Sequence, residues 1–252
     1  MISRREPMFN VPPVVTAMLA AMALVHAVRT LLLTARDDAQ FLLLFSFIPA
    51  RYDPAIAAQG IPGGWGADVW TFVTYAMIHA DWTHLMLNGI WLLAFGSAVA
   101  RRFGPTRFLG FAIVTAAAGA ALHLATHAGD VWPMVGASAS ISGFMAAAVR
   151  FIFHTDGPLG FFSGDAYRRP VAPLTTALRD PRVIAFLAIW FGLNLLFGVG
   201  SISLSGEQQS VAWEAHIGGF LAGLLLFPFF DPIGKGQALP SDDDTATGAA
   251  SG

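Results

Sequence analysis

Long apolar stretches, separated by shorter polar connections, run along most of the chain. A transmembrane helix needs about 20 consecutive, mostly apolar residues. Six stretches approach that length, at about 12–33, 83–100, 107–126, 138–154, 182–199 and 211–230. The pattern predicts an all-α membrane protein, built as a bundle of six transmembrane helices. The first stretch is too long for a secretory signal peptide and lacks a clear cleavage site, so we count it as a helix.

Two further apolar runs, at about 41–49 and 69–78, are too short to span a bilayer. Both fall between the first and second predicted helices. We therefore expect an ordered insertion there, lying in or near the membrane interface.

The arginines set the expected orientation, because cytoplasmic connections of membrane proteins are rich in Lys and Arg. They cluster at the N-terminus, at the second connection and at the fourth: Arg4, Arg5, Arg101, Arg102, Arg107, Arg168, Arg169, Arg179 and Arg182. In the other connections, 34–82, 127–137 and 200–210, most of the charged residues are acidic. We expect these to face outward and both termini to face the cytoplasm.

This orientation divides the chain into three parts. Residues 1–11 form a cytoplasmic N-terminus, and residues 12–231 form the membrane domain. Residues 232–252 are acidic and rich in small residues, which is typical of a disordered segment, so we expect a disordered cytoplasmic tail.

Composition narrows the function. Hydrophobic residues make up 55% of the chain and charged residues 12%, against about 25% charged in soluble domains. The net charge of -2 argues against a nucleic-acid partner, because phosphate binding needs a clustered basic excess. The chain has no cysteine, which excludes disulfides, thiolate metal sites and cysteine nucleophiles.

Polar side chains within three of the apolar stretches are the candidate catalytic residues. His216 lies inside the last stretch, where an ionisable group is costly and indicates function. Ser138 opens the fourth stretch at its outer end. His84 and Asn88 are four residues apart and share one face of the second helix. We expect all four at similar depth, in a water-accessible pocket open to the outer face.

Other chemistries fit the spacing poorly. His79 and His84 are five residues apart, about 140° around a helix, so they would not project together as zinc ligands. Acidic residues fall in connections or, like Glu214, at a helix end, so a pair of intramembrane carboxylates is missing. We expect no metal and no cofactor, and we interpret His123 and His127 as interfacial or packing residues. Nucleophilic catalysis by serine remains.

These motifs resemble those of the rhomboid intramembrane serine proteases, in the same order along the chain. They are H-x-x-x-x-H-x-x-x-N (His79, His84, Asn88), G-x-S (Gly136, Ser138) and A-H-x-x-G-x-x-x-G (Ala215, His216, Gly219, Gly223), and Trp70 matches a tryptophan of the family's first outer loop. The resemblance implies a rhomboid-like bundle over about 12–231, with Ser138 as nucleophile and His216 as general base. It assigns His84, Asn88 and the Ser138 backbone N–H to the oxyanion hole. It gives His79 a structural role and makes Gly136, Gly219 and Gly223 structural residues near the site.

The implied function is cleavage of other transmembrane proteins in the lipid bilayer by a Ser–His dyad, since Glu214 points about 200° away from His216 around the helix. The family usually has Gly where Ala139 stands and often Arg where Thr71 stands. The Ala139 departure leaves open a catalytically silent protein that binds membrane helices. A transporter that uses intramembrane His, Ser and Asn is a second alternative, although the predicted helices show no evident inverted repeat. We expect a bacterial plasma membrane as the location.

Overall fold

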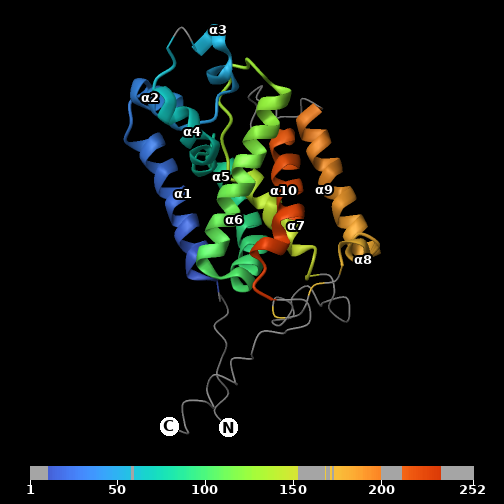
Figure 1. The fold of residues 1–252 in the computed structure, drawn as a ribbon. Coiled ribbons are helices and arrows are strands. Elements are labelled where there is room, and N and C mark those ends of the chain that lie inside the picture. The colour runs from blue at the N-terminus through green and yellow to red at the C-terminus, as the bar shows by residue number, and fades with distance from the viewer. Residues whose placement is uncertain are drawn as a thin grey trace, which may run out of the picture.

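The protein, in a computed structural model, is described over residues 11–57, 60–152, 168, 171, 173–199 and 212–233. Every regular element in these ranges is a helix, and one isolated antiparallel bridge pairs Phe47 with Met134. The long helices lie side by side, and the short helices α2, α3 and α4 gather at one end of the bundle (Figure 1). The predicted N-terminus and tail lie almost entirely outside the described residues.

The helices of the bundle follow the predicted apolar stretches, apart from one short helix between the fourth and fifth stretches. They are α1 (Pro13–Leu31), α5 (Trp82–Trp91), the π-helical segment η3 (Leu92–Gly96), α6 (Ser97–Thr126), α7 (Ser138–Ala148), α8 (Leu174–Ala177), α9 (Pro181–Val199) and α10 (Trp213–Phe230). Three described stretches are long and apolar enough to cross a membrane: Pro13–Leu31, Trp82–Thr126 and Trp213–Phe230. Helices α7 and α9 are shorter and apolar. The all-α prediction is confirmed, and the count of six spans stays a prediction.

The stretch Trp82–Thr126 is one run of helical residues that folds back on itself. Gly104 has φ 73° and ψ 169°, in the left-handed half of the map, and Pro105 follows it. A side chain at Gly96 would lie 3.7 Å from the ring of Phe108, although these residues would be about 18 Å apart along a straight helix. The reversal separates the second and third predicted stretches where the sequence analysis placed the break.

Helix α7 lies in the core, against α6 and α10 (Figure 1). All of its residues from Ala139 to Ala148 are buried. Glycines allow the close approach, because a Cβ added at Gly219 would overlap the Ala139 carbonyl and one at Gly223 would lie 2.5 Å from the Gly143 oxygen. The small residues Ala139 and Gly143 of α7 therefore face Gly219 and Gly223 of α10.

A buried ion pair between Arg102 and Asp231 lies at the C-terminal end of α10. Arg102, which is 1% exposed, donates two hydrogen bonds to Asp231, directly after α10, at 2.8 and 2.9 Å. The guanidinium also lies 4.9 Å from the ring centre of Phe151 and 5.6 Å from that of Phe227. Bidentate pairing offsets the cost of burying this charge.

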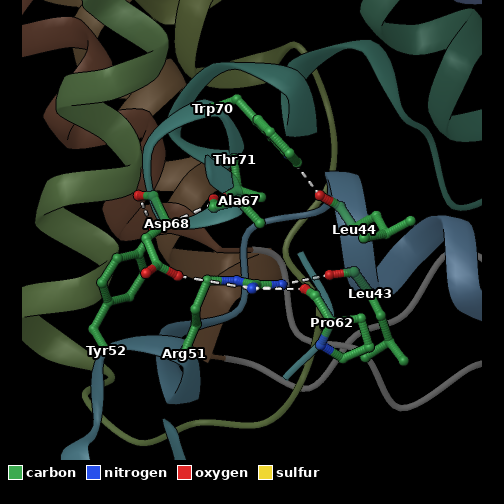
Figure 2. A network of polar contacts seen from close by, with 9 residues as sticks. All are labelled: Leu43, Leu44, Arg51, Tyr52, Pro62, Ala67, Asp68, Trp70 and Thr71. Carbon is green, nitrogen blue, oxygen red and sulfur yellow. Dashed lines mark hydrogen bonds and ion pairs between the residues drawn. The ribbon is translucent and has the colours of Figure 1, made fainter. Parts of the chain in front are cut away.

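The predicted insertion between α1 and α5 is ordered. It consists of α2 (Ala35–Phe45), η1 (Pro49–Tyr52), α3 (Pro54–Ala57), α4 (Gly64–Thr74) and η2 (Tyr75–Met77). Figure 2 shows the Arg51 guanidinium at its centre, where it donates to the carbonyls of Pro62 and Leu43 and lies 3.8 Å from Asp68. One cation thus satisfies carbonyls from separate parts of the insertion.

Candidate active site

The nucleophile and base of the predicted site lie in contact. Ser138 is the first residue of α7, and its Oγ lies 2.7 Å from Nε2 of His216 in the second turn of α10. Both residues are half-buried. Gly136 shapes the approach to Ser138 with φ +120°, which L-residues rarely adopt, while its N–H donates to the Tyr75 carbonyl at 3.0 Å.

The other nitrogen of His216 also has a partner, which the sequence analysis missed. The Oδ1 of Asn194, on α9, accepts a hydrogen bond from His216 Nδ1. The amide group of Asn194 is oriented because its Nδ2 donates to the Trp190 carbonyl at 2.8 Å. With the proton on Nδ1, the lone pair of Nε2 faces the Ser138 hydroxyl, as a general base requires.

Asn194 is therefore the residue that orients His216. The sequence analysis considered Glu214 for this role and excluded it. Glu214 lies instead beside His123 and His127. The site is a Ser–His pair with an asparagine behind it rather than an unsupported dyad. A lone Asn in an apolar stretch, with no motif at fixed spacing, gave no sequence signal for this role.

His84 and Asn88 lie where α5 begins. Asp81 caps the helix by accepting from the His84 N–H at 2.8 Å. The Ala80 N–H points to His84 Nδ1 at 3.5 Å, which leaves the ring proton on Nε2. A Cβ added at Gly136 would lie 2.7 Å from that Nε2 and 3.7 Å from Ser138 Oγ, so both atoms lie next to the same glycine.

Asn88 is 5% exposed, and its Nδ2 donates one hydrogen bond to the His84 carbonyl at 2.9 Å. An amide nitrogen carries two protons, so a second donor remains. His84, Ser138 and His216 lie close together, and Asn88 is hydrogen-bonded to His84 one turn along the helix.

His79 lies behind the site and is fully buried, with its ring centre 5.1 Å from that of His84. Burial, reinforced by the neighbouring His84, lowers the pKa of His79 to about 3, so the ring is neutral at pH 7. Its carbonyl accepts from Arg29 of α1 at 2.9 Å, and Arg29 also pairs with Asp38 of α2 at 2.7 Å. These contacts suit the structural role expected of His79.

The other serines of α7 are engaged with the backbone. Ser140 Oγ donates to the Ala112 carbonyl at 2.8 Å, and Ser142 Oγ donates to the Ser138 carbonyl at 2.7 Å. Both contacts agree with the packing role that serines in membrane helices usually have.

The two departures from the rhomboid motifs have structural counterparts. The methyl group of Ala139 faces Gly119 of α6, where an added Cβ would lie 2.5 Å from it, so a missing side chain on α6 makes room for the extra one on α7. Thr71 is buried and donates to the Ala67 carbonyl at 2.6 Å.

The guanidinium inside the insertion comes from Arg51 instead of position 71. Trp70, the residue before Thr71, donates to the Leu44 carbonyl at 2.8 Å (Figure 2). A cation therefore anchors the insertion although the sequence has Thr after the tryptophan.

Comparisons with known proteins identify the family of the chain. The family described as the Rhomboid domain matches residues 66–230. RHOMBOID-like protein 4 of Arabidopsis thaliana is 25% identical over 199 residues, which cover 75% of this chain and 43% of that protein. The chain thus matches less than half the length of this relative. Because the relative is a plant protein, the bacterial membrane stays a prediction.

Proposed function

Because this chain belongs to the rhomboid family and is an all-α, multi-pass membrane protein, we propose that it is an intramembrane serine endopeptidase. It cleaves peptide bonds of other membrane proteins within or near their transmembrane segments. The observation that carries the proposal is the 2.7 Å contact between His216 Nε2 and Ser138 Oγ, with Asn194 bound to the opposite ring nitrogen.

Acylation begins when His216 Nε2 takes the Ser138 hydroxyl proton as Oγ attacks a peptide carbonyl. The resulting oxyanion receives hydrogen bonds from the Ser138 backbone N–H, His84 Nε2 and Asn88 Nδ2. The N-terminus of α7 supports this charge, because the first N–H groups of a helix lack intrahelical partners and carry the positive end of its dipole.

Collapse of the tetrahedral intermediate breaks the C–N bond, and His216 passes its proton to the leaving amine. An acyl-enzyme on Ser138 remains. Water then gives a proton to His216 and attacks the ester carbonyl, and release of the acid returns that proton to Ser138.

The substrate segment must expose its peptide bond to Ser138. Backbone groups in lipid are paired within their own helix, so unwinding them is costly. Small or helix-breaking residues near the outer membrane interface lower that cost, and we expect them around the cleaved bond.

The decisive experiment uses purified chain, a model transmembrane substrate and a serine-directed fluorophosphonate. Ser138→Ala and His216→Ala should each abolish cleavage while the melting temperature holds, and the double variant should be no worse, because residues that act as a unit are not additive. Fluorophosphonate should label the natural chain and not Ser138→Ala. Ser140→Ala and Ser142→Ala are matched controls that keep turnover.

Each alternative predicts a different result. A catalytically silent helix-binding protein would bind the substrate without cleavage or labelling. A transporter would keep its activity in Ser138→Ala. Substantial turnover by Ser138→Ala would refute the assignment, and loss of all turnover in a control variant would move the nucleophile there.

The arginine pattern supports a site that opens to the outer face. Reporter fusions after Arg102 and Arg169 should then report cytoplasm, and fusions after Gly129 and Gly206 should report the outside. An inversion at any of the four would contradict the proposed topology.

A further inference from the structure

A second group of titratable side chains lies where α6 ends and α10 begins. His123 and His127 are four residues apart at the end of α6, with their ring centres 4.5 Å apart, and Glu214 lies in the first turn of α10. One donor atom from each of the three lies within 4.8 Å of the others. The proposed cleavage reaction uses none of these groups.

The separations are unusual for direct pairing. His123 Nδ1 lies 3.9 Å from one Glu214 oxygen, and His127 Nε2 lies 3.8 Å from the other, which is beyond hydrogen-bond range. Zinc ligands lie about 2.0–2.2 Å from the metal, so two ligands of a tetrahedral ion are roughly 3.3–3.5 Å apart. The two His–Glu separations exceed this spacing by a few tenths of an ångström, and the separations within the cluster extend to at most 4.8 Å, so side-chain rotations must draw the three groups together for an ion to bind.

A neighbouring hydroxyl orients His127 for coordination. Thr126 Oγ1 can donate its proton to the Leu122 or His123 carbonyl, both at 3.1 Å, so it accepts from His127 Nδ1 at 2.9 Å. The lone pair of His127 is then on Nε2, the atom that faces Glu214. Metal-binding histidines are commonly held this way by a hydrogen bond to the second ring nitrogen.

His123 supplies an independent observation. His123 is 7% exposed, and its Nδ1 has no hydrogen-bond partner among the described residues. A buried polar nitrogen without a partner is costly. This nitrogen points toward the same carboxylate as His127, so an ion bound between the three would satisfy it.

We propose that His123, His127 and Glu214 form a zinc site that ties the end of α6 to the beginning of α10. Two imidazoles and one carboxylate suit Zn²⁺ better than Mg²⁺ or Ca²⁺, which prefer oxygen ligands. Three protein ligands leave a fourth position for water. The His79–His84 spacing of five had argued against zinc, whereas the spacing of four in His123–His127 puts both rings on one face.

The test uses chelator-treated, full-length chain without a polyhistidine tag, in detergent. Added Zn²⁺ should bind at one ion per chain and raise the melting temperature. Glu214→Gln, which keeps the size of the side chain, should lose both stoichiometric binding and the temperature increase. Glu207→Gln makes the same chemical change at a residue that is not one of the three proposed ligands, and His154→Gln removes a histidine that is not one of them, so both should bind zinc like the natural chain.

A second variant guards against a folding defect in Glu214→Gln. Thr126→Val keeps all three ligands and removes the hydrogen bond to His127, so zinc affinity should fall about 10- to 100-fold. Cobalt substitution should give the visible bands of a tetrahedral site in the natural chain and not in Glu214→Gln.

Equal zinc binding by the natural chain and Glu214→Gln, or unchanged affinity in Thr126→Val, would overturn the site. None of these measurements uses peptide cleavage, so this proposal and the proposed function can fail separately.

Discussion

Helices α7 and α9 are both strongly apolar, yet they occupy opposite environments. All residues of α7 after Ser138 are buried, and most are Ala, Gly or Ser. Helix α9 carries large side chains, and three of them, Ile184, Ile189 and Leu195, are more than half exposed. Hydropathy therefore identifies membrane helices but does not distinguish a helix packed on other helices from one that faces lipid.

The candidate site includes one residue from the enclosed helix α7 and one from the more exposed helix α9. Ser138 begins the enclosed helix α7, whereas Asn194 projects from α9, which packs on α10 through the stacked rings of Trp190 and Phe220 at 4.9 Å. The enclosed helix α7 holds the nucleophile in place, and the more exposed helix α9 supplies the hydrogen bond that orients the His216 ring. Variants on the enclosed side should therefore have the larger effects.

The largest effect should come from the seam between α7 and α10. Gly219→Val should prevent stable folding, because the added Cβ would overlap the Ala139 carbonyl and backbone cannot move aside cheaply. Gly192→Val on α9 is the matched control, since a Cβ there meets nothing within 4 Å among the described residues. Recovery of folded protein and its melting temperature give the comparison. Equal tolerance of the two changes would contradict the packing difference.

The oxyanion donors should come next. His84→Ala and Asn88→Ala should each lower kcat by about 10²–10³, with little change in KM, because these hydrogen bonds matter mainly in the transition state. His79→Ala should instead lower the melting temperature, with activity falling only as folded protein is lost. Steady-state kinetics and thermal unfolding separate the roles. If His79→Ala kept its melting temperature and lost turnover, His79 and His84 would exchange roles.

Asn194 should have a smaller effect. Asn194→Leu should lower kcat about 10- to 100-fold, toward the lower end of what a general base contributes, because His216 stays in place and loses only its orientation. Asn194→Asp should restore part of the rate, since a carboxylate oxygen can also accept from Nδ1. Leu195→Ala, one residue along on the exposed face, should leave kcat unchanged. Equal rates for Asn194→Leu and the natural chain would remove Asn194 from the site.

The smallest effect should be a gain. Gly192→Ala should raise the stability of the chain by up to about 1 kcal/mol, because Ala is the better helix former and the position has room. Gly143→Ala on α7 should have the opposite sign, since its Cβ would lie 2.5 Å from the Thr115 side chain. Unfolding in mixed micelles measures the change in stability of both variants. A gain in stability for both would show that helix propensity outweighs packing.

The sequence predicted the helices closely, because apolar length is a direct consequence of bilayer thickness. Predicted stretches at 12–33 and 182–199 correspond to Pro13–Leu31 and Pro181–Val199. The fourth was predicted to reach 154, whereas α7 ends at Ala148 and a turn containing the buried Arg150 follows. Apolar residues continue through that turn, so hydropathy alone gave no sign of the helix end.

The site was predictable where residues recur at fixed spacing, and not where one residue from a distant helix completes it. Ser138, His216 and His84 belong to motifs, but Asn194 is 22 residues from His216 along the chain and meets it only through packing. The fit between Ala139 and Gly119 is likewise a relation between two helices. Ala139 departs from the family motif in the sequence, but the space for its methyl group beside Gly119 exists only in the folded chain.

The ion pair between Arg102 and Asp231 sets an order for assembly during synthesis. Its partners are 129 residues apart, so at 5–20 residues per second the ribosome needs roughly 6 to 26 seconds to deliver Asp231 after Arg102. During that interval the guanidinium, at the reversal between the second and third predicted helices, must stay in water or at the lipid headgroups. It can enter the core only when α10 is complete, so the last membrane helix to be made brings the earlier ones together.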